Sequence, residues 1–247
     1  KEENRLKLST NFVKDYIDID VDSKTLAEDM TRVGNEYDSV ENLINATKLT
    51  IGKVVECKEH PDSDHLHVCK VDIGTEVLDI VCGAPNVAAG QKVIVSKVGA
   101  KLAGGFEIKP AKVRGVESNG MICSLSELGV DKKAQTEEQL SGIYVFEDDA
   151  PVGETNVLEY LGLDDTLLDI GLTPNRADAM SHLGVARDLR AGMLQNNPNQ
   201  HISEILTPSV TKFKVEKRTL KYDIDVSDSK QTPRYAGVTI SDVEVKS

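Results

Sequence analysis

The stretch from Lys48 to Gly129 decides the fold, and it begins KLTIGKVVECKEHPDSDHLHVCKVDIG. Short runs rich in β-branched residues alternate in it with clusters of Gly, Pro, Asn and Asp at regular spacing. This pattern is typical of a small all-β barrel or sandwich and not of a helical or βαβ unit. We expect strands over residues 49–57, 67–73, 77–82, 92–98, 106–114 and 120–124.

The number and spacing of these strands favour one particular barrel. Five or so strands in about 80 residues suit the oligonucleotide-binding (OB) fold, a closed barrel without exposed sheet edges.

Basic residues gather in the second half of this stretch. Between positions 92 and 114 the only acidic residue is Glu107, and the basic ones are Lys92, Lys97, Lys101, Lys109, Lys112 and Arg114. A local excess of positive charge on neighbouring strands can follow a phosphate backbone. The alternative is a solvated rim whose lysines keep an exposed hairpin from pairing with other chains.

Length and charge limit the class of protein. The chain has 247 residues, enough for more than one domain, and a net charge of −12 with a pI near 4.9. A free-standing nucleic-acid binder is usually basic, so any RNA contact here is local or shared with a partner. Aromatic residues make up 4% of the chain and Trp is absent, so platforms for base stacking are scarce.

The first residues and the cysteines predict a cytoplasmic protein. The N-terminal KEENRLKLST lacks the apolar stretch of a signal peptide, and no apolar run approaches the roughly 18 residues of a membrane span. The cysteines form no C-x-x-C pair and stand in or beside apolar strands, as reduced, buried side chains do: Cys57, Cys69, Cys82 and Cys123.

One loop concentrates possible metal ligands within eight residues, namely His60, Asp62, Asp64, His65 and His67. Imidazole and carboxylate ligands suit zinc. The alternative is a Pro-Asp turn whose polar side chains bond neighbouring backbone N–H groups while alternate side chains diverge along the next strand. We predict no metal site.

The segments on either side of the barrel predict a second domain. Residues 23–34 form an amphipathic helix in which Thr25 and Glu28 have capping-box spacing, and Asp22 and Ser23 also suit a helix start. This helix needs a partner, and a second helix over 181–193 has a matching apolar stripe. We therefore expect a small discontinuous α+β domain of residues 6–46 and 150–196, with the OB barrel of residues 47–149 inserted in it.

The turn TPNRADAMSHLG offers Arg176, Asp178 and His182 as candidate catalytic groups. No nucleophile stands beside them, while Asp178 and Ser181 can cap the helix that follows. We favour the structural interpretation and predict no catalytic residue in this chain.

Residues 197–247 change in character. A polar linker containing proline is followed by alternating apolar and polar residues, as in half-buried strands. We expect this segment to be the β-rich start of a further domain, with the pattern interrupted at Ser247.

Three motifs in the barrel carry a resemblance. HPDSDHLHVCKVDIG, VCGAPNVAAGQKVIVSKVGAKL and RGVESNGMICSLSELGV resemble the tRNA-binding OB domain of several aminoacyl-tRNA synthetases. That domain usually has Arg where this chain has His65. The resemblance implies an RNA-facing surface that includes Ser118, Asn119, Met121 and Ser124, which we add to the six basic residues as candidate tRNA-binding groups.

The order of all segments extends the resemblance from about residue 6 to the end of the chain. With TPNRADAMSHLGVARDL as its most discriminating piece, the chain is similar to the N-terminal third of the bacterial phenylalanyl-tRNA synthetase β subunit family. The resemblance implies an α2β2 heterotetramer that joins phenylalanine to tRNA(Phe) with ATP and Mg²⁺. It also implies that the catalytic pocket lies on the α subunit and that the editing centre follows RYAGVTI.

Two other functions stay open at the level of sequence. The chain could be a free-standing tRNA-binding or chaperone module, against which the discontinuous domain and the acidic charge argue. It could also be a structural scaffold without RNA contact, which the acidic balance and the scarcity of aromatic residues favour.

Overall fold

The computed structural model describes residues 4–196, 199, 201–216, 219–220 and 222–245. The chain divides into two units, residues 1–206 and 207–247, and each is described by itself. Positions 197, 198 and 200 of the expected linker, and 217, 218, 221, 246 and 247 of the expected further domain, lie outside the described residues.

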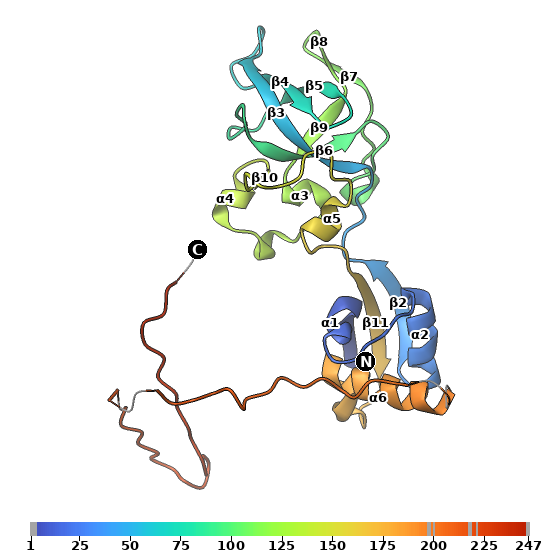
Figure 1. The fold of residues 1–247 in the computed structure, drawn as a ribbon, viewed down its shortest axis with the longest axis vertical. Helices are drawn as coiled ribbons and strands as arrows, with labels where there is room; N and C mark the ends of the chain where they lie inside the picture. Colours follow the sequence, from blue (N-terminus) through green and yellow to red (C-terminus); the bar gives the residue numbers. More distant parts are fainter. Residues whose placement is uncertain (1–3, 197–198, 200, 217–218, 221, 246–247) are drawn as a thin grey trace. The chain divides into compact units, whose positions relative to one another are not determined.

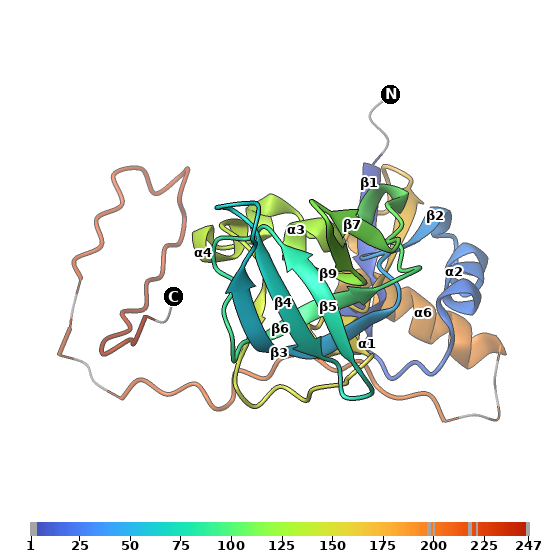
Figure 2. The same cartoon turned by 90° about the horizontal axis from the view of Figure 1, so that it is seen from above.

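The central stretch folds as an antiparallel β-barrel (Figures 1 and 2). Its strands are β3 (Leu49–Glu59), β4 (His67–Asp72), β5 (Val77–Cys82), β6 (Lys92–Lys97), β9 (Gly120–Cys123) and β10 (Val145–Phe146). The hydrogen-bonded order is β10-β6-β3-β4-β5, and β9 pairs with β6. The N–H of Asn119 donates to the carbonyl of Asp79 at 2.8 Å, which nearly closes the barrel between β5 and β9. The α+β class with an OB-like barrel is thus confirmed.

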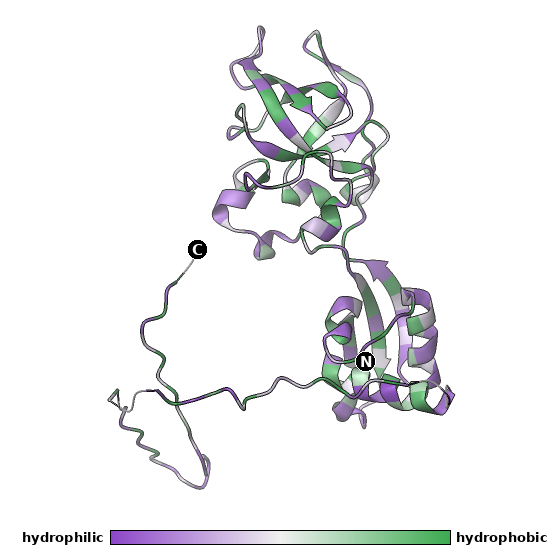
Figure 3. Cartoon of the chain, viewed as in Figure 1, coloured by the Kyte–Doolittle hydropathy of each residue, from purple (hydrophilic) through white to green (hydrophobic). Residues whose placement is uncertain are grey.

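Alternation along the strands produces the barrel core, and green and purple segments alternate along the long strands in Figure 3. Two clusters of buried side chains lie on opposite faces of the barrel strands, since the adjacent residues Val93 and Ile94 belong to different clusters. The cluster around Val71 and Ile80 fills the interior, and the cluster around Ile51 and Ile94 packs against Leu128 of α3. Burial of side chains of this size is the main stabilising term for the barrel.

The strand expected over 106–114 is wrong in its first half. A 3₁₀ turn (η1, Ala103–Gly105) and a single bridge between Lys101 and Glu107 occupy the region before Pro110. Pro110 has no N–H to donate to a ladder, so pairing resumes only after it.

A short hairpin follows Pro110. It consists of β7 (Ala111–Val113) and β8 (Val116–Ser118), which form a separate two-stranded sheet. The two residues between the strands, Arg114 and Gly115, have φ of +44° and +89°. Positive φ at both central residues is what a tight two-residue hairpin turn requires.

Short helices follow the barrel strands: α3 (Leu125–Leu128), η2 (Lys132–Ala134), α4 (Glu137–Leu140) and α5 (Val157–Tyr160). Val157 and Ala150 are buried in the same cluster as the barrel residues Ile51 and Ile94. Residues 150–163, which the sequence assigned to the α+β domain, therefore pack on the barrel core.

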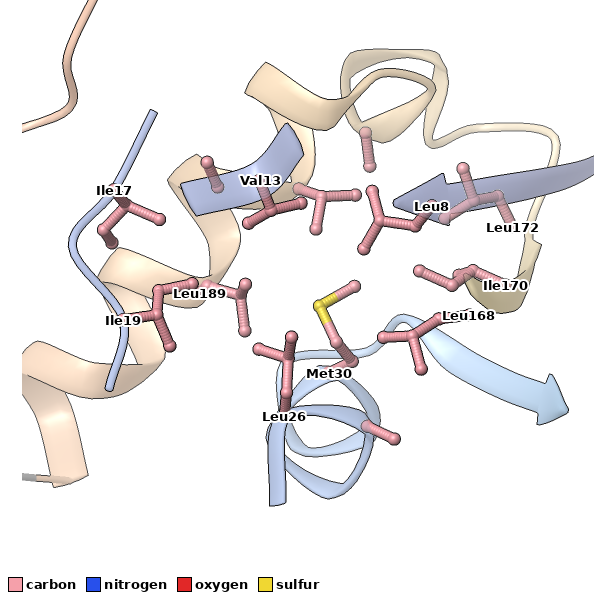
Figure 4. Packing of buried hydrophobic residues seen from close by; sticks show 14 of the residues in the cluster. Leu8, Val13, Ile17, Ile19, Leu26, Met30, Leu168, Ile170, Leu172 and Leu189 are labelled. Carbon is pink, nitrogen blue, oxygen red and sulfur yellow. The ribbon is translucent and has the colours of Figure 1, made fainter. Parts of the chain in front are cut away.

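The flanking segments build a three-stranded antiparallel sheet covered by helices. Its order is β1-β11-β2, from β1 (Asn4–Ser9), β11 (Thr166–Leu172) and β2 (Glu36–Asn42). The helical segments are α1 (Thr10–Lys14), α2 (Ser23–Arg32), η3 (Ala177–Ala179) and α6 (His182–Asn196). Leu8, Met30, Leu168 and Leu189 meet in one core (Figure 4), so the early and late segments fold together.

The helix starts test two expectations about capping. Asp22 is the N-cap of α2 and accepts the N–H groups of Lys24 and Thr25, both at 3.0 Å. Of the two helix starts that the sequence left open, the one at Asp22 is confirmed and the capping box at Thr25 and Glu28 is not the cap of this helix. Asp22 is the preferred cap because its carboxylate accepts several hydrogen bonds at once. Ser181 caps α6 as expected, since its Oγ accepts the N–H of Gly184 at 3.0 Å.

The second unit contains no helix or strand among its described residues, although its pattern predicted strands. Its apolar side chains are exposed: Tyr222 by 79%, Val238 by 67% and Ile240 by 75%. Alternation alone does not create a strand, because a strand needs a hydrogen-bonded neighbour and a core to cover one face. None of the helices described here is long and apolar enough to cross a membrane.

Candidate nucleic-acid interface

Two loops project from the same end of the barrel (Figure 1). We call residues 60–66, between β3 and β4, the first loop, and residues 98–119, between β6 and β9, the hairpin loop because it contains β7 and β8. In OB barrels the loops at these two positions, together with the second and third strands, commonly bind oligonucleotides.

His60 joins the two loops. It is only 4% exposed. Its Nδ1 accepts the N–H of Asp62 at 3.0 Å, and its Nε2 lies 3.2 Å from the carbonyl oxygen of Val113 on β7. Because a backbone N–H can only donate, Nδ1 is the unprotonated nitrogen and Nε2–H donates to Val113. Both ring nitrogens are occupied, so this imidazole is not free to bind a metal.

Arg114 makes a second connection between the loops. Its Nη1 donates to the carbonyl oxygen of Asp62 at 2.8 Å. The residue is exposed, and a guanidinium has five N–H donors. Donors that Asp62 does not use are available to an anionic group such as a phosphate.

The six expected basic residues do not form one continuous track. Lys109, Lys112 and Arg114 are exposed in or beside the hairpin, with Lys109 Nζ 4.0 Å from Glu107. Across the whole hairpin loop, four basic residues (101, 109, 112, 114) stand against two acids (107, 117), an excess of two positive charges.

The remaining three basic residues lie away from the β7–β8 hairpin. Lys97 and Lys101 lie beside the segment that enters the barrel, since the N–H of Lys97 donates to Lys48 and the N–H of Lys101 to Thr47 Oγ1 at 3.0 Å. Lys92 is half-buried, and its ammonium donates to the carbonyls of Asp148 and Ala150 at 2.5 and 2.6 Å. Lys92 thus holds the chain that follows β10.

The polar candidates around β9 have internal partners. Ser118 is buried, accepts the N–H of Val81 at 3.0 Å and donates to the carbonyl of Gly120 at 3.2 Å. Ser124 caps α3 in a capping box with Glu127. These hydroxyl groups stabilise the barrel.

Two further candidates are half-buried. Asn119 connects β8 to β9, and Met121 packs against the barrel core beside the fully buried Cys123. Neither side chain is fully exposed at the surface.

The histidine-rich loop does not assemble a metal site. His65 is 86% exposed with its Nε2 3.3 Å from Asp64, while His60 is turned to Val113. Among the described residues, no group of three or more His, Cys, Asp or Glu side chains is placed to hold a metal ion.

The TPNRADAMSHLG turn is a structural ion-pair network. Arg176 donates to Asp178 at 2.9 Å and to Asp188 on α6 at 2.5 Å, and Asp188 accepts the side-chain N–H of the buried Asn35 at 2.8 Å. The hydrogen bonds and charges of both carboxylates raise the pKa of Arg176, which stays fully charged. The network connects the turn, α6 and the end of α2.

His182 lies beside a serine and an aspartate but forms no catalytic arrangement with them. Ser9 Oγ donates to Asp165 at 2.5 Å, and the N–H of Ser9, not its hydroxyl, donates to His182 Nε2 at 3.0 Å. Asp165 also accepts the Thr10 hydroxyl at 3.1 Å and the N–H of Asn11 at 3.0 Å. The sequence did not single out Asp165, which gathers the donors at the start of α1.

The four cysteines are free thiols. Cys69, Cys82 and Cys123 are buried, as expected, while Cys57 is half-buried with its Sγ 3.8 Å from that of Cys69. Burial raises the pKa of Cys69 and Cys82, and raises that of Cys123 to about 12. Burial thus favours the neutral thiol form of all three.

Known proteins resemble this chain both in the barrel and over nearly its whole length. Residues 49–155 match the family described as "Putative tRNA binding domain". The chain is 43% identical over 249 residues to the phenylalanine–tRNA ligase beta subunit of Bacteroides fragilis, covering 98% of this chain and 29% of that protein.

Two further relatives have the same description. Identity to the beta subunit of Geobacillus kaustophilus is 51% over 187 residues (74% of this chain, 23% of that protein), and to that of Bacillus subtilis 43% over 242 residues (96% and 29%). The chain spans less than a third of the length of these relatives. Residues 49–155 are therefore similar to this tRNA-binding domain family, and nearly the whole chain is similar to a segment of the bacterial phenylalanine–tRNA ligase beta subunit.

Proposed function

We propose that this chain is the non-catalytic N-terminal part of a phenylalanine–tRNA ligase β subunit, and that it contributes tRNA binding and subunit assembly to protein biosynthesis in the cytoplasm. The observation that carries the proposal is the OB barrel, matched to a tRNA-binding family, whose two ligand-binding loops meet and present Lys109, Lys112 and Arg114. Exposed cations on such loops suit the phosphate backbone of RNA.

The whole enzyme would supply the chemistry. We propose that the chain pairs with an α subunit in an α2β2 heterotetramer, which binds ATP and Mg²⁺ and joins phenylalanine to tRNA(Phe). We assign no step of that reaction to a residue of this chain. Its residues would bind and orient tRNA while the reacting groups lie elsewhere.

The proposed domain division keeps the boundaries expected from the sequence, although residues 150–163 pack on the barrel. We propose a discontinuous α+β domain of residues 6–46 and 150–196, a tRNA-binding barrel of residues 47–149, and the start of an editing-type domain within 197–247. The shared core of Leu8, Met30, Leu168 and Leu189 supports the discontinuous domain.

The test is a titration of this chain with tRNA(Phe) at several salt concentrations. Neutralising each phosphate contributes about −0.7 to −0.9 to the log–log salt slope, so three to five lysine and arginine contacts predict a slope of about −2 to −4.5. The double variant Lys109→Ala/Lys112→Ala should weaken binding and make the slope shallower by about 2.

The matched control removes two positive charges from the other domain. Lys14 and Lys24 are exposed on α1 and α2, so Lys14→Ala/Lys24→Ala changes the net charge equally and should leave the slope unchanged. Equal losses in the two double variants would indicate a long-range effect of net charge and not a binding site.

The competing function is a scaffold without RNA contact. The net charge of −12 and the internal engagement of Lys92, Ser118 and Ser124 favour it. A scaffold predicts no tRNA binding even at low salt, whereas the proposed function predicts binding that strengthens as salt is lowered.

A further inference from the structure

We infer that His60 is a positioning residue for RNA: it latches the β7–β8 hairpin onto the first loop and so holds the cations of the hairpin in place before RNA arrives. This inference rests on the proposed function and adds to it the device that shapes the binding surface. His60 itself is buried, so it acts through the hairpin that it holds.

The hairpin needs such support. β7 and β8 have three residues each and pair only with each other, outside the barrel sheet. An isolated two-stranded hairpin is at best marginally stable in water. Ser118 ties the far end of β8 to β5 through the N–H of Val81. The turn end, with Arg114 and Gly115, depends on other contacts.

The latch acts at that turn end. Nε2–H of His60 reaches the carbonyl of Val113, the last residue of β7, and Arg114 donates to the carbonyl of Asp62. Two hydrogen bonds of opposite direction thus cross between the loops within two residues of the turn. Nδ1 of His60 accepts the N–H of Asp62, which orients the ring for the bond to Val113.

The bond from His60 affects binding through the fraction of molecules in which the hairpin is docked on the first loop. A ligand that needs the docked hairpin binds with an apparent Kd equal to the intrinsic Kd divided by the docked fraction. Losing one buried hydrogen bond shifts such a local equilibrium by about five-fold. His60→Ala should therefore weaken tRNA binding by up to about five-fold while leaving the salt slope unchanged, because every cation is still present.

Two conservative variants separate the latch from a general role in folding. His60→Gln places an amide donor near the position of Nε2 and can keep the bond to Val113. His60→Asn places its amide near Nδ1 and can keep only the local bond to Asp62. The latch predicts tRNA affinity near the parent value for His60→Gln and the weakened value for His60→Asn, while loss of local loop structure predicts the reverse order.

The experiment measures tRNA(Phe) binding and amide hydrogen exchange in the full chain and its three variants. The expected result is faster exchange of the β7–β8 ladder in His60→Ala and His60→Asn, together with weaker binding, and parent-like behaviour in His60→Gln. Faster hairpin exchange with unchanged tRNA affinity would overturn the positioning role. Unchanged hairpin exchange in all three variants would overturn the latch itself.

The same measurements distinguish this inference from the proposed function. If the parent chain binds no tRNA, the proposed function fails and the role of His60 toward RNA fails with it. If the parent chain binds tRNA with a steep salt slope and the His60 variants bind equally well, the proposed function stands and only the present inference is overturned.

Discussion

His182 is a neutral hydrogen-bond acceptor in the folded chain, because its Nε2 receives the N–H of Ser9. Burial lowers the pKa of His182 below its ordinary value of 6.5, and the charge of Asp165 opposes this only in part. Below pH 6.5 the unfolded chain binds a proton here that the folded chain resists. The contribution of His182 to the free energy of unfolding is therefore complete above pH 6.5 and is lost as the pH falls below it.

Denaturant unfolding between pH 8 and pH 5 checks this prediction. His182→Gln keeps an acceptor for Ser9 but does not titrate, so the loss of stability between pH 7 and pH 5 should become smaller than in the parent chain. Hydrogen bonds from Ser9 and Asn11 lower the pKa of Asp165 despite its burial, and its contribution is lost only below about pH 4, in a separate window. Identical profiles for parent and variant would show that another group titrates.

At the scale of secondary-structure elements, Gly184 allows α6 to lie directly on the 177–179 turn. A Cβ at this position would stand 2.1 Å from the carbonyl oxygen of Asp178 and 2.9 Å from Cα of Ala179. Both are backbone atoms, which cannot rotate away. Gly184→Ala should therefore lower the free energy of unfolding by about 3 kcal/mol, at the upper end of overpacking costs.

The control for this change is Gly171→Ala on β11, in the sheet whose core α6 shares. The nearest atoms to its added Cβ lie at 3.8 and 3.9 Å, which is ordinary van der Waals contact. This variant should stay within about 0.5 kcal/mol of the parent. Calorimetric or denaturant unfolding of both variants measures the two free energies of unfolding. A Gly184→Ala variant as stable as the parent would mean that α6 can move away from η3 without loss of stability.

Local sequence chemistry predicted most barrel elements, because turns and alternation act within a few residues. Five of the six expected strands are present, and the sixth is broken at Pro110. The sequence pattern does not predict β2, because β2 is an edge strand whose residues are nearly all exposed and show no apolar–polar alternation. The start of α2 at Ser23 agrees with the expected helix, and its cap, Asp22, is one of the two helix starts that the sequence left open.

The candidate site was predicted less completely, because its contacts join residues distant in the chain. His60 stands 53 residues before Val113, and Lys92 stands 56 and 58 residues before its carbonyl partners. Spacing along the chain does not show that Lys92 is engaged while Lys112 is exposed. The basic cluster was visible in the sequence, and its division into three places was not.

At the scale of the whole chain, the α+β core extends to Leu206. Ile202 is buried in that core, Arg190 Nε donates to the carbonyl of Ser203 at 2.8 Å, and the N–H of Leu206 donates to Tyr16 at 2.7 Å. Ending the chain after residue 206 should change the free energy of unfolding by less than about 0.5 kcal/mol. Ending it after residue 196 should cost roughly 3 kcal/mol, mainly through the lost burial of Ile202 and Ile205.

Thermal unfolding of the two shortened chains beside the parent checks this expectation. The shorter chain should melt several degrees lower, and the longer one close to the parent. Equal melting of both shortened chains, well below the parent, would show that residues 207–247 stabilise the first unit.

The barrel leaves and re-enters the α+β sheet through neighbouring strands. Asn42 on β2 pairs with Thr166 on β11, and the N–H of Leu43 donates to Asp165 at 2.8 Å. Inside the barrel, Ile51 exchanges hydrogen bonds with Glu154 and Gly153 at 2.9 and 2.8 Å. At both places, Asn42 beside Thr166 and Ile51 beside Gly153, the two chain segments lie about one strand spacing apart. A two-residue turn can close a gap of this size. In evolutionary terms, one event can therefore insert, remove or exchange the gene segment for the barrel. The α+β domain and the barrel each keep a continuous backbone path after such an event.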